Sequence, residues 1–203
     1  EYWRVKADFM NPELKSELAK IDGKTAKVSN EQEALKIEAS LNKGIYKLVD
    51  IEEKDSTRNP AAPFTTSTLQ QEASRKLGLS VKQTMIVAQQ LYEGNVGNIP
   101  GHTGGLITYM RTDSLNLSTV ATTAAKAVIE EEYGKEYSLA KPRVYKSKAK
   151  GAQEAHEAIR PVNLALKPSM IKAYVENIQY KLYSLIWKRT LATQIEQAKI
   201  ANT

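Results

Sequence analysis

The sequence contains no cysteine, and its only imidazoles are those of His102 and His156. Disulfides and thiolate chemistry are therefore excluded, and a zinc site is not expected from so few soft ligands. No apolar run approaches the roughly 18 residues of a membrane span, so no membrane partner is expected. The first ten residues have neither an apolar signal-peptide core nor an initiator Met, which predicts an excised piece of a longer protein.

Charge of one sign does not dominate the sequence, although bases exceed acids. There are 29 Lys and Arg against 23 Asp and Glu, giving a net charge of +6. This balance favours a polyanionic partner with a mixed protein surface rather than a basic tail. No GxxxxGK[ST] loop occurs, so nucleotide hydrolysis has no support. A length of 203 residues is enough for one large domain or two modest ones.

The first 55 residues predict a small β-rich or α+β unit. Two β-rich runs, 2–7 and 44–51, flank a predicted helix at 30–41. The run 54–63 then combines two prolines with several turn-forming residues, which is typical of a linker. We place a domain boundary near Pro60.

Helical signals dominate the rest of the chain. Leu69, Ala73 and Leu77 recur at helical spacing before Gly78, and a capping box at Ser80 opens a second helix that ends at Gly94. This pair has the length and turn of a helix-turn-helix, a motif that also occurs in ordinary cores. Further helices are predicted at 118–133, 153–159 and 169–193, the last with an apolar core stripe.

Two intervening segments leave alternatives open. The run GNVGNIPGHTGG, residues 94–105, holds five glycines and predicts a flexible loop, either a tolerated insertion or a segment that adjusts to a ligand. Residues 141–150 carry five cations and no acid. They form either a solvated loop or a phosphate-contacting strip whose affinity falls with salt.

The segment 105–114, GLITYMRTDS, carries the strongest chemical signal. In an extended strand the side chains of Tyr109 and Arg111 share a face, because they are two residues apart. A phenol oxygen beside a planar cation suits attack on a phosphodiester. The competing interpretations are an ordinary tyrosine, since phenols ionise only near pH 10, and an ion pair between Arg111 and Asp113. Asp113 could equally cap a turn.

Three runs in the same order resemble the bacterial type IA DNA topoisomerases. They are APFTTSTLQQEASRKLGLSVKQTMIVAQQLYEG at 62–94, LITYMRTDS at 106–114 and QEAHEAIRP at 153–161. The best-matched region runs from Pro60 to Arg189. The resemblance implies a mainly helical α+β fold, in which a discontinuous β-rich domain, 1–59 and 195–203, holds an inserted tyrosine domain, 60–194, with a helix-turn-helix or winged-helix core.

The resemblance also implies an activity for the parent protein. Tyr109 would attack one strand of single-stranded DNA, form a 5′-phosphotyrosine and later release it, which relaxes negative supercoils without ATP. Arg111 would hold the scissile phosphate, and Asp113 would orient Arg111. His156 and Arg160, four residues apart on the predicted helix, would contact DNA. The alternative is a helix-turn-helix DNA-binding module without catalysis.

The same resemblance implies a magnesium ion in the intact enzyme. The family binds it in an N-terminal domain with a DxDxE pattern, and that pattern is absent here. Consecutive Glu130, Glu131 and Glu132 splay around a helix and do not converge on one ion. The fragment is therefore expected to bind no metal and to be inactive in relaxation. A monomer in the bacterial cytoplasm, at the nucleoid, is the implied setting.

Overall fold

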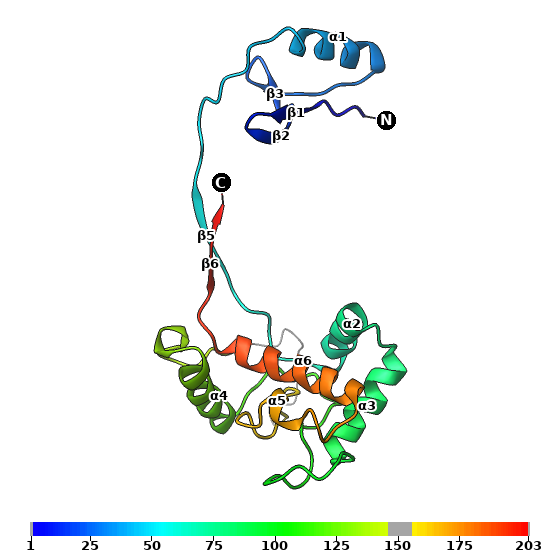
Figure 1. Cartoon of the computed structure of the whole chain (residues 1–203), viewed down its shortest axis with the longest axis vertical. Coiled ribbons are helices and arrows are strands. Elements are labelled where there is room, and N and C mark those ends of the chain that lie inside the picture. Colours follow the sequence, from blue (N-terminus) through cyan, green and yellow to red (C-terminus); the bar gives the residue numbers. More distant parts are fainter. Residues whose placement is uncertain (1, 146–155, 203) are drawn as a thin grey trace. The chain divides into compact units, whose positions relative to one another are not determined.

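The computed structural model describes residues 2–145 and 156–202, which mix helices with small sheets (Figure 1). They fall into two compact units that divide between Glu52 and Glu53. The mixed α+β class predicted from the sequence is confirmed at this level. The finer division into a strand domain and an inserted tyrosine domain stays a prediction.

The first unit is built from two hairpins and one helix. Strand β1 (Lys6–Met10) pairs antiparallel with β2 (Glu13–Glu17), and β3 (Lys20–Ile21) pairs with β4 (Lys24–Thr25). Helix α1 (Glu31–Leu41) begins where the Asn30 side chain accepts the Glu33 N–H at 2.9 Å. Among the described residues of this unit, only Val28 is a buried hydrophobic residue.

Two expectations near the unit boundary are wrong. The run 44–51 forms no strand, and Ile45 and Val49 are 100% and 89% exposed. A strand lies instead in the supposed linker, where β5 (Lys54–Arg58) pairs antiparallel with β6 (Ala198–Asn202). All five residues of β5 are exposed, so no apolar alternation marks it in the sequence. Pairing with a remote segment defines this strand.

The second unit holds the main helices. They are α2 (Thr66–Leu77), α3 (Val81–Glu93), α4 (Thr119–Glu132), the 3-10 turn η1 (Lys135–Tyr137), α5 (Pro168–Ile171) and α6 (Asn177–Thr193). Ser80 and Ser118 cap α3 and α4, and Gly78 and Gly94 end α2 and α3 in the left-handed conformation. These starts and stops confirm the sequence prediction, because capping depends on local residues.

Two predicted helices differ from the structure. The predicted helix 169–193 is divided into α5 and α6, because Glu176 starts a new capping box with Gln179. Of the predicted helix 153–159, residues 153–155 lie outside the described residues and 156–159 are not helical. The Ile159 N–H donates to the Phe64 carbonyl at 2.8 Å, so long-range pairing replaces the helical bond.

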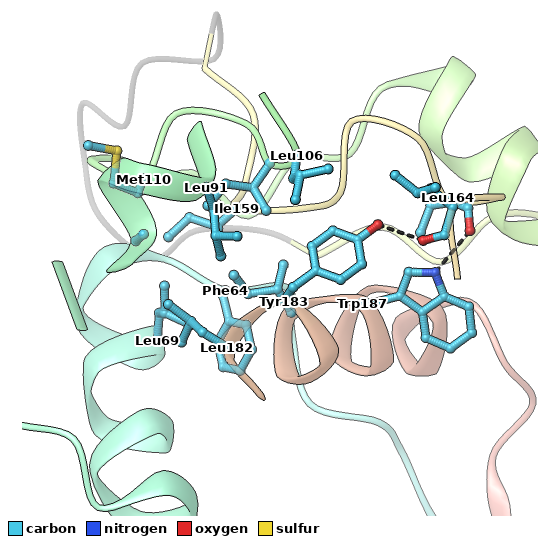
Figure 2. Close-up of a cluster of buried hydrophobic side chains, with 14 of the residues drawn as sticks. Phe64, Leu69, Leu91, Leu106, Met110, Ile159, Leu164, Leu182, Tyr183 and Trp187 are labelled. Carbon is cyan, nitrogen blue, oxygen red and sulfur yellow. Dashed lines mark hydrogen bonds between the residues drawn. The ribbon is translucent and has the colours of Figure 1, made fainter. Parts of the chain in front are cut away.

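Helix α6 lies at the centre of the core and contacts α2, α3, α4 and α5. Tyr183 is buried, and its hydroxyl donates to the Leu166 carbonyl at 2.7 Å (Figure 2). The Trp187 indole donates to the Leu164 carbonyl at 2.9 Å. Both polar tips are therefore satisfied inside the core. The core stripe predicted along this helix is confirmed.

Candidate active site around Tyr109

The Tyr109 segment is extended but is not a strand. Its one backbone bridge joins Ile107 to Pro161, so the predicted strand is wrong. Exposure nevertheless alternates along the chain: Tyr109, Arg111 and Asp113 are exposed, and Met110, Thr112 and Ser114 are buried. An extended backbone with this alternation turns the exposed side chains outward and anchors the others. The three outward residues are those that the sequence analysis selected.

Thr66, in the first turn of α2, holds the backbone around Arg111. Its hydroxyl donates to the Met110 carbonyl at 2.7 Å and accepts the Thr112 N–H at 2.9 Å. Its own N–H donates to the Thr112 carbonyl at 2.9 Å. Arg111 is thus fixed on both sides by one residue of a helix that belongs to the core.

Thr108 anchors the other side of Tyr109. Its hydroxyl donates to the Ala158 carbonyl at 2.7 Å, and its N–H donates to the Arg160 carbonyl at 2.9 Å. The Arg160 N–H returns a bond to the Thr108 hydroxyl at 3.0 Å. Tyr109 therefore lies between Thr108 and Thr112, which are both hydrogen-bonded to remote segments, and this limits the freedom of its backbone.

The two central side chains are open to solvent. Tyr109 is 48% exposed, and its ring packs edge-to-face with the ring of Tyr92, with 5.2 Å between the two centroids. Within residues 2–145 and 156–202, the Arg111 guanidinium has no ion pair and no hydrogen bond, and the alternative pair with Asp113 is not formed. A phenol and an unpaired guanidinium are thus both accessible to an anionic substrate.

A surface pocket brings three of the predicted residues together. Arg111, Asp113 and His156 line it with Thr65, Thr66, Ser67 and Thr112. His156 is exposed, so its imidazole is available to a ligand. A guanidinium, an imidazole and nearby hydroxyls are donors that suit a phosphate. Tyr109 and Arg160 do not line this pocket.

Arg160 serves a different set of contacts. Its guanidinium binds the Glu157 carboxylate at 2.5 Å and the Pro161 carbonyl at 2.9 Å, and its side chain is 13% exposed. The expected helical face shared with His156 is wrong, because this run is not helical. A DNA contact by Arg160 stays a prediction, and its guanidinium is already occupied by protein partners.

Glu157 joins this network to helix α4. Its Oε1 accepts the N–H of Ser118, the N-cap of α4, at 2.7 Å. Partial burial acts to raise the pKa of Glu157, but the hydrogen bonds from Arg160 and Ser118 outweigh burial and hold the pKa below its ordinary value. The carboxylate therefore stays ionised and links the run 156–161 to the start of α4.

The basic run contributes to the fold where it is described. Arg143 donates to the Thr193 and Ile195 carbonyls at 2.9 and 2.8 Å, at the end of α6 and just after it. Tyr145 donates to the Pro60 carbonyl at 3.2 Å, and burial raises the pKa of its phenol. Residues 146–150 lie outside the described residues. Within the predicted phosphate strip, 141–150, the Arg143 guanidinium is thus already bound by the protein itself.

The described residues do not fit a magnesium ion. Across residues 2–145 and 156–202, no group of three or more His, Asp or Glu side chains is placed to hold a metal. Glu131 and Glu132 instead form ion pairs with Lys167, at 3.6 and 2.5 Å. In the same ranges, no helix is long and apolar enough to cross a bilayer.

Sequence analysis missed several residues that shape this site. Thr66, Thr108 and Tyr92 hold the segment of Tyr109 and Arg111 through contacts between remote segments, and Glu157 links the neighbouring run 156–161 to α4. The partners of Thr66 lie 44 and 46 residues away, so no local pattern indicates them. Thr65 caps the start of α2, and a threonine just before a helical run is a local signal that could have marked this region, although the sequence analysis did not use it.

Comparison with known proteins places this arrangement in a family. The family profile described as DNA topoisomerase matches residues 1–203. The DNA topoisomerase 1 of Rickettsia bellii is 46% identical over 202 residues, covering 97% of this chain and 25% of the relative. The protein of that name from Xylella fastidiosa strain Temecula1 is 42% identical over 211 residues, covering 100% of the chain and 26% of the relative.

A solved structure agrees with the sequence relatives. Full-length topoisomerase I from Thermotoga maritima matches with a TM-score of 0.71 and 38% identity, covering 97% of this chain and 29% of that one. The chain therefore belongs to the DNA topoisomerase family. Within that family its relatives are bacterial topoisomerase I, of type IA. The chain spans about a quarter of the length of these curated relatives.

Proposed function

We propose that the protein to which this chain belongs cleaves and rejoins one strand of DNA through a 5′-phosphotyrosine. The observation that carries the proposal is an accessible Tyr109 two residues from an accessible Arg111 whose guanidinium has no partner among the described residues. The relatives named DNA topoisomerase 1 support it. Relaxation of negative supercoils then needs no ATP, because the covalent link keeps the energy of the broken ester.

The proposed step is a transesterification. The Tyr109 oxygen loses its proton and bonds to the scissile phosphorus, and the bond from phosphorus to the 3′ oxygen breaks. The 3′ oxygen gains a proton and leaves as a hydroxyl, so that no net proton is consumed. Reversal restores the strand and frees the phenol. Arg111 offsets negative charge on the non-bridging oxygens, the role that a planar guanidinium performs in phosphoryl transfer. Two threonine anchors hold both residues in place before DNA enters.

The pocket beside Arg111 is proposed to bind a phosphate of the same strand. His156 and Arg111 supply cations or donors, and Thr65 and Ser67 supply hydroxyls. Asp113 lines the pocket as well, where it is proposed to orient Arg111 once DNA is bound. We propose that Arg160 supports His156 by holding the backbone of the run 156–161 in place. Direct contact between Arg160 and DNA is proposed as its secondary role.

Mg²⁺ is proposed for the intact enzyme, bound by a domain outside this chain. The described residues supply no ligand group for it, so no step above depends on the ion. We accordingly propose that the isolated chain is inactive in relaxation. The substrate is proposed to be single-stranded DNA, and the protein is proposed to act as a monomer in the bacterial cytoplasm.

The alternative is a DNA-binding module without catalysis. Helices α2 and α3, joined by a three-residue turn at 78–80, have helix-turn-helix proportions, and a winged-helix core is the finer form of that proposal. The named relatives do not favour this alternative. A module without catalysis also gives no role to Arg111, which lies beside Tyr109 and has no partner among the described residues.

Plasmid relaxation tests the proposal. The full-length protein, with magnesium and without ATP, is expected to change linking number in steps of one, and Tyr109→Phe is expected to abolish the change while single-strand binding persists. A Tyr109→Phe protein that relaxes plasmid at the normal rate would refute the assignment. Robust relaxation by the isolated chain would refute its proposed dependence on an outside domain.

A further inference from the structure

Tyr92 is the aromatic neighbour of the proposed nucleophile. It lies in the last turn of α3, and its ring meets the Tyr109 ring at 5.2 Å and 64° between planes. This edge-to-face geometry is the favoured one for two aromatic rings. Within the described ranges, the Tyr109 hydroxyl has no hydrogen-bond partner. Among the described residues, Tyr92 is therefore the aromatic ring that contacts the Tyr109 ring.

The backbone keeps Tyr92 at this place. The Leu106 N–H donates to the Leu91 carbonyl at 2.7 Å, which ties the Tyr109 segment to the end of α3. A Cβ on Gly105 would lie 2.0 Å from the Tyr92 carbonyl oxygen, and one on Gly94 would lie 2.6 Å from the Gly104 oxygen. The glycines at both ends of the loop 94–105 therefore allow close approach of two backbones.

These contacts give Tyr92 a fixed geometry relative to Tyr109. Thr108 anchors the backbone one residue before Tyr109, and Leu106 anchors it three residues before. Once both backbones are fixed, the remaining freedom of Tyr109 is rotation of its side chain. The Tyr92 ring lies against one side of the Tyr109 ring and restricts its rotation, although Tyr109 is half exposed.

We propose that Tyr92 is a positioning residue that holds the Tyr109 ring in the orientation for in-line attack. The inference rests on the proposed function, because it concerns the same nucleophile. The ring of Tyr92 performs this role and its hydroxyl does not, since the contact is between rings. Tyr92 then raises the rate of cleavage without binding DNA, since orientation of a reacting group acts on the chemical step.

The test uses the full-length protein, magnesium and a single-stranded oligonucleotide under single-turnover conditions. Tyr92→Ala is expected to slow covalent adduct formation about tenfold or more, whereas Tyr92→Phe, which keeps the ring, stays within about twofold of wild type. The oligonucleotide Kd is expected to stay within about twofold for both variants. Tyr92→Leu serves as a second variant that keeps apolar bulk if the alanine variant is poorly folded, and it is also expected to be slow.

Tyr133→Ala is the matched control. Tyr133 is 48% exposed, follows α4 and has no ring contact with Tyr109 among the described residues. Its variant is expected to cleave at the wild-type rate. Normal cleavage by Tyr92→Ala would overturn the inference, and so would a loss confined to Kd, which indicates base stacking. Failure of the wild-type protein to form an adduct would instead refute the proposed function.

Discussion

Arg111, Arg143 and Arg160 carry the same guanidinium but meet different partners. Arg143 donates to two backbone carbonyls and Arg160 binds Glu157, whereas Arg111 has no partner in the described ranges. The sequence predicted Arg111 from its spacing to Tyr109, and the observed exposure agrees with that choice. The sequence could not show that the Arg160 guanidinium is bound by Glu157, because that pair depends on how 156–161 packs.

Thr66 offers a test of the anchored segment. Thr66→Val keeps the shape but leaves the Met110 carbonyl and the Thr112 N–H without their hydroxyl partner. We expect the free energy of unfolding of this chain to fall by about 1–3 kcal/mol. Thr66→Ser keeps the hydroxyl and is expected to lose less than half as much. Urea unfolding followed by circular dichroism measures both, and equal losses would contradict the hydrogen-bond account.

Glu157 predicts how stability depends on pH. Its pKa is lowered in the folded state, so its contribution is present above the ordinary value of 4.5 and is lost as pH falls through the folded value. Glu157→Gln is expected to reduce the free energy of unfolding at pH 7 by about 1–2 kcal/mol. The difference in free energy of unfolding between wild type and Glu157→Gln is expected to become smaller below about pH 4.5, as denaturant titrations can measure. A gap that stays constant down to pH 3 would show that ionisation of Glu157 contributes nothing.

Among the elements, those defined by local residues were predicted and those defined by remote pairing were not. Ser80, Gly78 and Ser118 mark helix ends that the structure confirms. Strand β5 and the extended run 156–161 depend on partners more than 40 residues away, so the sequence favoured a linker and a helix there. The same limit hid the anchors of the Tyr109 segment while leaving Tyr109 itself recognisable.

Gly105 tests the contact between α3 and the Tyr109 segment. Gly105→Ala places a Cβ 2.0 Å from the Tyr92 carbonyl oxygen, a backbone atom that cannot move without shifting α3. We expect it to lower the free energy of unfolding by about 3 kcal/mol. Gly101→Ala is the control, since it meets open space and costs about 1 kcal/mol for its positive φ. Equal denaturation midpoints for the two variants would contradict the close-packing account.

At the scale of the whole chain, the net charge of +6 is compatible with many polyanions. The chain spans about a quarter of the length of its curated relatives, so its charge describes one part of such a protein. Family membership and the mixed fold were predictable from the ordered motifs.

Salt dependence tests the proposed anion site on this scale. Binding of a single-stranded oligonucleotide to this chain is expected to weaken with salt, with a slope of log K against log salt of about −0.7 for each phosphate contacted. Arg111→Gln is expected to make that slope less negative by about 0.7, because about one phosphate contact is lost. Lys24→Gln, an equal charge change on β4, is expected to leave the slope unchanged. Affinity that is independent of salt would rule out phosphate contacts, as fluorescence anisotropy can show.

The site of covalent attachment is the most direct test of the whole account. The full-length protein is mixed with magnesium and a single-stranded oligonucleotide, denatured, digested and analysed by mass spectrometry. The account predicts a phosphodiester-linked nucleotide on the peptide that contains Tyr109, and no adduct in Tyr109→Phe. An adduct on another residue, or one that persists in Tyr109→Phe, would contradict it.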